Sequence, residues 1–343
     1  MLDCTLTCRS LANLSHAQAV GRLFHIPLKT VDHHVGFLTP QQFYTMTSVL
    51  FANVFLNLDD GKAFELRQGA LQSAAALSKI TQGVVELVRH SDWGTLVSWV
   101  LKATGFAPKE DDLADSYGTK LIRRMIGHED GTSAADVTAA IIPTMAAAVC
   151  TQAQGLSQVL DLLMQKEYIH HWEIIRSLAR SDKEADFEKL EKYALECLRL
   201  ATPAFGLLRK LDADSMTIDD GRYGKTELKR GGQVFVNFIE CGKDGTIFED
   251  PEEIKLDRDP KLYIHHGWGV HACLGRNIVT TALAMQLKCL ARCKRLRRAP
   301  GPQGTLKYTV QPPGFKVYMK ENWSDYWPFP TTMKFLHDGL EDW

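Results

Sequence analysis

The sequence of 343 residues has little that would place it in an oxidising compartment or in a bilayer. Its 8 cysteines include no Cys-x-x-Cys pair and no disulfide-framework spacing, which indicates a reducing, cytoplasmic location. Residues 1–15 lack the continuous apolar core of a secretory signal, and no unbroken apolar run of about 18 residues predicts a transmembrane segment. The formal net charge of −1 gives no overall attraction to nucleic acid or to an anionic membrane.

The first two hundred residues of the sequence are predicted to be mainly helical. Apolar residues at helical spacing predict helices over residues 40–57, 63–90, 168–180 and 183–201. Ser133 and Asp136 form a capping box, which predicts the start of a long helix that ends near Met164. Pro143 is expected to kink this helix, because proline removes one backbone hydrogen bond.

A region of mixed character follows Pro203. Glycine, aspartate and β-branched residues predict a strand over 232–237 and a pair of strands over 306–320. We therefore expect a mainly α fold with small β-sheets, built as one domain over residues 1–343. The helical part ends near residue 203, and strands and loops make up residues 204–343.

One cysteine lies in a glycine-rich loop directly before a predicted helix. The loop reads HGWGVHACLG over residues 266–275. Gly267, Gly269 and Gly275 leave room for a flat macrocycle, and a helix beginning near Cys273 would aim amide hydrogens at its sulfur. His271 lies two residues before the sulfur, where it can donate to an acidic group on the edge of a ligand. The pattern is typical of a cysteine bound axially to haem iron.

Two alternatives explain the same loop. The first is a plain turn before an amphipathic helix. The second is a zinc site made by His265, His266, His271 and Cys273. Zinc sites favour two well-separated ligand pairs, whereas these four candidates lie on one loop.

At these residues the chain resembles the cytochrome P450 superfamily, whose cysteine loop it matches except at His266, where the family has phenylalanine. Two further segments, ECLRLATP over 196–203 and FEDPEEIKLDR over 248–258, resemble the family in the same order. The resemblance implies a haem b cofactor (iron protoporphyrin IX) held by Cys273. Arg209 and His271 would bind the haem propionates. Glu196 and Arg199, which share a helix face, would form a buried structural ion pair.

Within that superfamily the chain is similar to the P450-like domain of fungal linoleate diol synthases, also called psi-factor-producing oxygenases. The similarity covers nearly the whole chain and includes Ile141–Ala148, Gln152–Gln154 and the segment 327–333. It implies that Thr151 and Gln154 lie on the distal face of the haem. Thr151 replaces the asparagine of these enzymes, and Cys150 occupies the place where monooxygenases carry a proton-relaying acid.

The resemblance implies rearrangement of fatty-acid hydroperoxides to diols, with a fatty-acid hydroperoxide as substrate and a separate fatty-acid dioxygenase as partner. The early elements of the family fold are expected to be missing, so the fold would be N-terminally shortened. A reductase-dependent monooxygenase acting on a lipophilic substrate and a truncated, non-catalytic haem-binding fragment are the alternatives. Membrane association is expected only through the lipid substrate. Trp172 and Arg176 imitate a propionate motif of the family, but they follow the long helix, so we interpret them as a coincidence.

Overall fold

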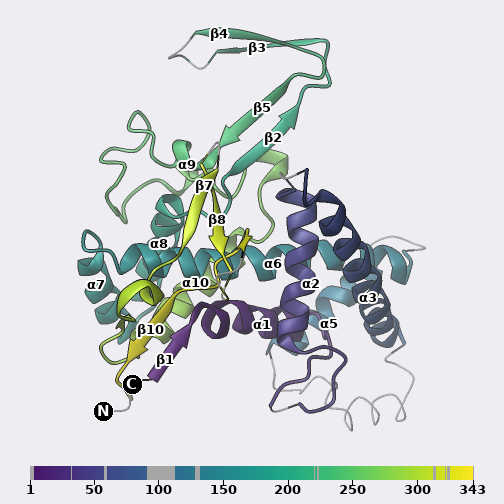
Figure 1. Ribbon diagram of the computed structural model, residues 1–343, viewed down its shortest axis with the longest axis horizontal. Helices are drawn as coiled ribbons and strands as arrows, with labels where there is room; N and C mark the ends of the chain where they lie inside the picture. Colours follow the sequence, from purple (N-terminus) through teal and green to yellow (C-terminus); the bar gives the residue numbers. More distant parts are fainter. Residues whose placement is uncertain are drawn as a thin grey trace. The chain divides into compact units, whose positions relative to one another are not determined.

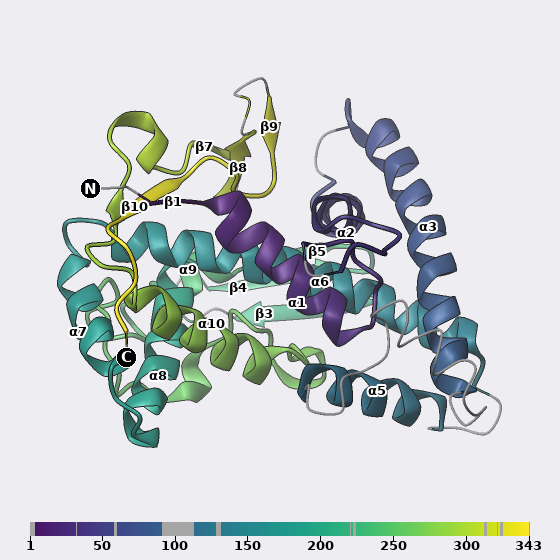
Figure 2. The same cartoon turned by 90° about the horizontal axis from the view of Figure 1, so that it is seen from below.

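The structure is a computed structural model, which describes residues 4–31, 33–57, 60–90, 113–127, 132–219, 221, 224–311, 314–320, 322 and 325–342. The chain divides into two compact units. The first consists of Met1–Ser157, Arg297–Tyr308 and Val317–His337, and the second of Gln158–Leu296, Thr309–Lys316 and Asp338–Trp343. Figures 1 and 2 show the helices and strands of both.

Helices dominate the first unit. They are α1 (Ser15–Leu23), α2 (Pro40–Phe55), α3 (Ala63–Arg89), α5 (Leu113–Ile126) and most of α6 (Ala134–Leu163). α2 begins at a capping box in which Thr39 and Gln42 exchange side-chain and backbone hydrogen bonds. The predicted helices over 40–57 and 63–90 are confirmed to within two residues.

The predicted long helix is α6. Its capping box is present, since Asp136 N donates to Ser133 Oγ and Ser133 N to Asp136 Oδ2, at 3.1 and 2.9 Å. The helix continues through Pro143. Among the described residues it alone is long and apolar enough to cross a membrane, but 44% of its most apolar window is buried within the protein. The core helix of a water-soluble protein has the same composition.

The second unit is built on three packed helices, α7 (Ile169–Ala179), α8 (Glu184–Leu200) and α10 (Arg276–Ala291). α7 and α8 confirm the helices predicted over 168–180 and 183–201. The C-terminal segment is bound to α7, because Glu341 pairs with Arg176 at 2.8 Å and with Arg180 at 2.5 Å. Arg176 is therefore occupied by a structural ion pair.

The sheets are small and antiparallel where their pairing is described. β1 (Cys4–Thr7), β10 (Lys334–His337) and β6 (Arg297–Arg298) form one sheet of the first unit. β2 (Gly206–Lys210) pairs with β5 (Gln233–Asn237), and β3 (Ser215–Asp219) pairs with β4 (Lys225–Lys229). The predicted strands near the C-terminus are β7 (Tyr308–Gln311) and β8 (Phe315–Met319), and β8 pairs with β9 (Tyr326–Trp327).

Short helical segments complete the described chain. They are α9 (Phe238–Cys241), the π-helical segment Arg9–Leu14, and the 3-10 turns Pro260–Leu262, Gly269–His271 and Gly301–Gly304. The mainly α fold with small sheets, as predicted, is confirmed. The strands β1 and β10 and the β3–β4 hairpin were not predicted from the sequence.

Candidate cofactor site

The loop around Cys273 is closed by its own backbone. Cys273 N donates to His266 O at 2.7 Å, and Ala272 N donates to Gly269 O at 3.0 Å. Gly267 and Gly269 have φ of +76° and +61°, a conformation that disfavours other residues. A Cβ atom on Gly267 would also lie 2.7 Å from His271 O. Two of the predicted glycines are therefore needed to form this loop.

The helix after the loop begins later than the sequence predicts. α10 starts at Arg276, and Arg276 N donates to Cys273 O at 3.3 Å. The cysteine thus precedes the helix by three residues, because Gly275 occupies the N-cap position. Within the described chain the amides of Leu274 and Gly275 have no acceptor. These two N–H groups are available to a bound thiolate.

The surface around the thiol fits a large apolar group. Cys273 is exposed, and beside it in sequence Val270 and Leu274 are 97% and 100% exposed. These two aliphatic residues lie three positions before and one position after the thiol, so the sequence around it presents apolar side chains to the surface. An exposed thiol flanked by small glycines and exposed apolar residues fits the chemistry of a haem ligand. His271, also exposed, ends the 3-10 turn that leads to the cysteine.

A zinc site does not form from the same residues. In the described part of the chain, no three His, Cys, Asp or Glu side chains come together as metal ligands would. His265 is instead buried and His266 half-buried, and in the described chain one buried ring nitrogen of each lacks a hydrogen-bond partner. Burial, with the charge of Arg276 nearby, lowers the pKa of His266 to about 4, and burial lowers that of His265 well below its ordinary value. Both imidazoles are neutral at pH 7.

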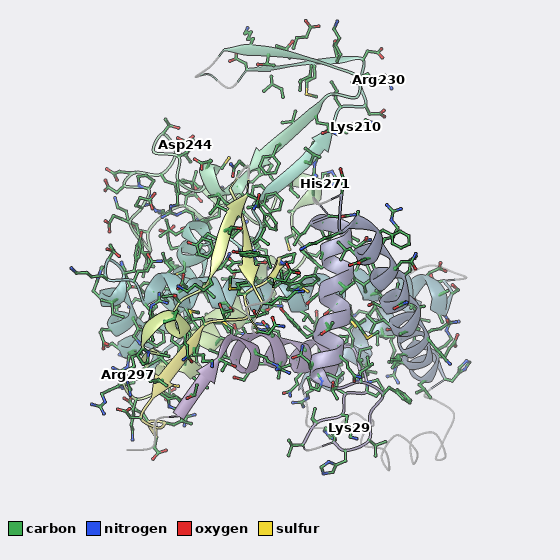
Figure 3. The ribbon with its side chains drawn as sticks, viewed as in Figure 1. Lys29, Lys210, Arg230, Asp244, His271 and Arg297 are labelled. Carbon is green, nitrogen blue, oxygen red and sulfur yellow. The ribbon has the colours of Figure 1, made fainter. Side chains whose placement is uncertain are left out.

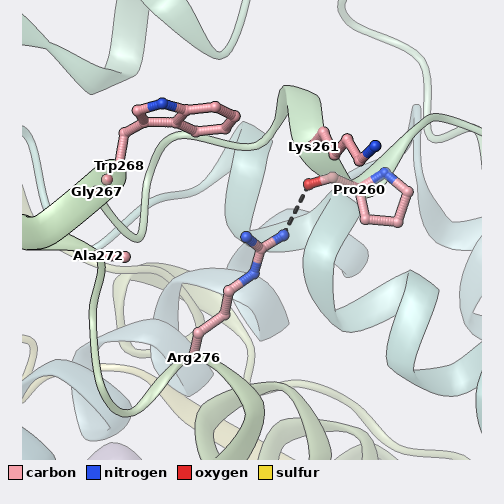
Figure 4. A pocket seen from close by; sticks show the side chains of 7 residues that line it. Pro260, Lys261, Gly267, Trp268, Ala272 and Arg276 are labelled. Carbon is pink, nitrogen blue, oxygen red and sulfur yellow. Dashed lines mark hydrogen bonds between the residues drawn. The ribbon is translucent and has the colours of Figure 1, made fainter.

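An open cleft of about 540 Å³ lies beside the loop. It is lined by Pro260, Lys261, Gly267, Trp268, Gly269, Ala272 and Arg276. In Figure 4, the Arg276 guanidinium reaches from α10 to Pro260 O, to which it donates at 2.7 Å. This contact ties the start of α10 to the turn that precedes the loop.

Glu196 and Arg199 form the ion pair that the sequence predicts. Arg199 Nε and Nη2 donate to the two oxygens of Glu196, both at 2.9 Å. The two residues are 0% and 1% exposed. Arg199 also donates to the carbonyls of Gly242, Pro251 and Glu253 at 2.6 to 2.9 Å. The pair therefore anchors the 242–253 segment to α8.

Three further donors to Glu196 were missed by sequence reasoning. Tyr263 Oη donates at 2.7 Å, Lys255 N at 3.0 Å and Arg258 Nε at 3.2 Å. Burial alone would raise the pKa of Glu196, but these hydrogen bonds and those from Arg199 outweigh it and lower the pKa. The only signal for Arg258 was its place in the family-like segment 248–258.

The distal candidates lie on α6. Thr151 Oγ1 donates to Ala147 O at 2.8 Å, within the helix. Gln154 is 5% exposed, and no hydrogen bond of its side-chain amide is found within the described chain. Cys150 is buried and donates to Ser48 Oγ of α2 at 3.6 Å. Burial raises the pKa of the Cys150 thiol to about 12, so this side chain does not relay protons at neutral pH.

Arg209 lies on β2, opposite Val234 of β5. Its side chain is exposed, and among the described residues the hydrogen bond found for it is from Nη1 to Leu208 O, at 3.1 Å. Toward the described residues, four of the five N–H donors of the guanidinium have no acceptor; its role toward a propionate stays a prediction.

A family model for cytochrome P450 matches residues 106–293. The bifunctional dioxygenase–epoxy alcohol synthase of Pyricularia oryzae is 34% identical over 96% of this chain, which spans 28% of that protein. Psi-producing oxygenase A of Emericella nidulans is 35% identical over 96% of the chain, which spans 30% of it. The chain thus covers under a third of these relatives.

Solved structures give the same fold at low identity. CYP109E1 of Bacillus megaterium, in complex with testosterone, superposes with a TM-score of 0.65 at 17% identity. The match covers 98% of this chain and 73% of that one. Cytochrome P450 EryK of S. erythraea also has a TM-score of 0.65, at 15% identity, and is covered to 71%.

Proposed function

Because the chain belongs to the cytochrome P450 family, we propose that Cys273 ligates its haem and that the protein rearranges fatty-acid hydroperoxides to diols. Haem is the cofactor of this family, and the relatives are fungal fatty-acid oxygenases with epoxy alcohol synthase or diol synthase activities in their names. When bound, haem supplies the one-electron chemistry that cleaves a peroxide bond.

The ligand assignment is supported by the loop. The thiol is exposed, the flanking glycines leave room, and the two amides that follow the sulfur have no acceptor among the described residues. Amide donors stabilise a thiolate and tune its basicity. Arg209 and His271 would hold the propionates, since both end in exposed donors.

The reaction assignment rests on the character of α6. Cys150 occupies the position where monooxygenases carry an acid, and its thiol donates a hydrogen bond to Ser48 Oγ in the core. The Thr151 hydroxyl donates to Ala147 O within its own helix. Among the residues that the structure describes, the Gln154 side-chain amide has no hydrogen-bond partner. A neutral amide can donate to the oxygen that leaves a peroxide, and this step needs no external proton.

An absorption spectrum tests the ligand first. The reduced protein with carbon monoxide should show the thiolate band characteristic of the family, and Cys273→Ala should abolish it. Cys289→Ala, which removes another exposed thiol, is the matched control and should leave the band unchanged. An unchanged spectrum in Cys273→Ala would disprove the ligand assignment.

An anaerobic assay tests the reaction. A linoleate hydroperoxide should be consumed without NADPH, reductase or dioxygen, and diols should be the product. Gln154→Leu should slow the reaction on the order of tenfold, equivalent to about 1.4 kcal/mol, while Gln152→Leu on the same helix should not. Thr151→Asn, which restores the residue of the diol synthases, should keep or raise the rate.

The same assay separates the competing functions. Products that require NADPH, a reductase and dioxygen would identify a monooxygenase. Epoxy alcohols in place of diols would retain the hydroperoxide substrate but change the product. Bound haem with no turnover under either condition would identify a non-catalytic haem protein.

A further inference from the structure

The connection between α1 and α2 contains a compact loop, which we call the 29–38 loop. Lys29 N donates to Leu38 O at 2.7 Å, so the two ends of the loop lie side by side. The chain passes so close to itself at Gly36 that a Cβ atom there would lie 2.4 Å from Lys29 N. Compact surface loops whose ends meet in this way are frequently functional.

Hydrogen bonds fix the backbone of the 29–38 loop. At its base Phe37 N donates to Pro27 O at 2.9 Å, and Leu28, which leads into the loop, is only 8% exposed. Farther out, Thr30 N donates to His33 O at 2.8 Å, and His33 N donates to Thr30 Oγ1 at 3.1 Å. The side chains of the loop are therefore carried on a defined turn that is anchored in the core.

Three large apolar side chains of the 29–38 loop are exposed. Val31 is 86% exposed, Phe37 72% and Val35 56%. Single exposed apolar side chains are common on protein surfaces, whereas three on one short closed loop form a patch of the kind that marks an interaction site. Figure 3 labels Lys29, where the loop begins, beyond the first turn of α2.

The polar residues of the 29–38 loop give it no net charge. Its sequence contains one lysine and one aspartate, Lys29 and Asp32. Lys29, His33 and His34 are exposed, and their side chains make no hydrogen bond or ion pair with the described residues. Polar side chains with apolar stems or rings can stay at the headgroup level while neighbouring apolar side chains enter lipid.

A lipid surface fits this patch better than a second protein does. Three side chains supply only a small part of the about 800 Å² that each partner buries in a standard protein interface. Shallow insertion into lipid needs no complementary shape, because each apolar side chain that leaves water contributes by itself. The choice of lipid rests in part on the proposed function, since a fatty-acid hydroperoxide is itself a lipid.

We propose that the 29–38 loop inserts Val31, Val35 and Phe37 into the surface of a lipid bilayer and so holds the protein where its substrate is dissolved. Because the loop is neutral, the attraction is hydrophobic and does not require anionic lipid. The insertion is shallow, so the peptide groups of the loop stay among the headgroups, where water satisfies them.

Vesicle flotation with the full chain tests this proposal. The vesicles consist of phosphatidylcholine and contain no hydroperoxide, so the result does not depend on whether the proposed reaction occurs. The chain should float with the vesicles. Raising the salt concentration from about 0.1 to about 1 M should not weaken binding, because salt screens only charge attraction.

Matched variants locate the contact. Val31→Asp places a carboxylate in the lipid and should weaken vesicle binding on the order of tenfold or more. Val54→Asp is its control, since Val54 is 67% exposed but lies about 20 Å from Pro40 along α2. Phe37→Ser should also weaken binding, whereas Phe64→Ser, at the same exposure of 72%, should not. Unaltered circular dichroism and haem content would show that the variants fold.

Three results would overturn the proposal. The first is the absence of vesicle binding by the folded chain. The second is binding that Val31→Asp and Phe37→Ser leave intact, or that Val54→Asp and Phe64→Ser weaken equally, since the contact would then lie elsewhere. The third is self-association of the chain that Val31→Asp abolishes, because a second copy would then cover the patch.

Discussion

Removal of the Glu196 carboxylate should be the most damaging single change in the second unit. This group accepts five hydrogen bonds, two from Arg199 and one each from Tyr263, Lys255 and Arg258. Glu196→Ala leaves the charges of Arg199 and Arg258 buried, with side chains 1% and 7% exposed. Breaking a buried pair in this way costs about 3–5 kcal/mol, a large share of a typical stability of about 5–15 kcal/mol.

The chain contains a matched control for this change. Glu173 pairs with Arg176 at the same i,i+3 spacing, at 3.2 Å, but its side chain is 66% exposed. Glu173→Ala should therefore change the free energy of unfolding by less than about 1 kcal/mol. Urea unfolding at pH 7, followed by circular dichroism, measures both variants. Equal losses in the two variants, or a loss under about 1 kcal/mol for Glu196→Ala, would refute the argument from burial.

The pH dependence gives a second test of the same group. The pKa of Glu196 is lowered in the folded protein, so its contribution is fully present above the ordinary glutamate pKa. It is lost as the pH falls from that value through the lowered folded one. Glu196→Ala should remove this acidic part of the stability profile, while Glu173→Ala should retain it.

Three further outcomes are expected. Glu341→Ala removes the contacts to Arg176 and Arg180, so hydrogen exchange over 338–342 should accelerate while global stability falls by about 1 kcal/mol; unchanged exchange would contradict the ion-pair anchor. Burial lowers the pKa of His265, so the stability it contributes is complete above its ordinary pKa and lost as the pH falls below it; His265→Phe should flatten the unfolding profile between about pH 6.5 and 5. Cys150→Asp should cost about 3 kcal/mol, as judged by urea unfolding, because it places a carboxylate where the side chain is fully buried, whereas Cys150→Ala should cost less.

Local signals explain why most helices could be predicted. The Ser133–Asp136 capping box and the apolar spacing of α2 and α3 lie within the elements they define. The strands β1 and β10 carry no such signal. They are four residues long, and they pair Cys4 with His337 across almost the whole sequence. Contacts of that separation are set by the packed fold and not by local pattern.

The partners of Glu196 show the same contrast between contacts that a local pattern predicts and contacts that the packed fold sets. Its i,i+3 partner Arg199 is visible on a helix face. Lys255, Arg258 and Tyr263 come from positions 59, 62 and 67 residues away, so spacing could not identify them. The start of α10 at Arg276 could not be predicted from local sequence either. Gly275 occupies its N-cap position in a conformation that the neighbouring residues do not specify.

Two departures from the family pattern, Cys150 and His266, have one physical consequence in common. Burial raises the pKa of Cys150 to about 12 and lowers that of His266 to about 4. Neither group therefore exchanges a proton with its surroundings near pH 7. A monooxygenase consumes protons from solvent with every dioxygen it reduces, whereas rearrangement of a hydroperoxide conserves all atoms and needs no net proton. The neutral Cys150 thiol in place of an acid removes one proton route for the first reaction and is compatible with the second, whereas His266 replaces a phenylalanine, which offers no proton route either.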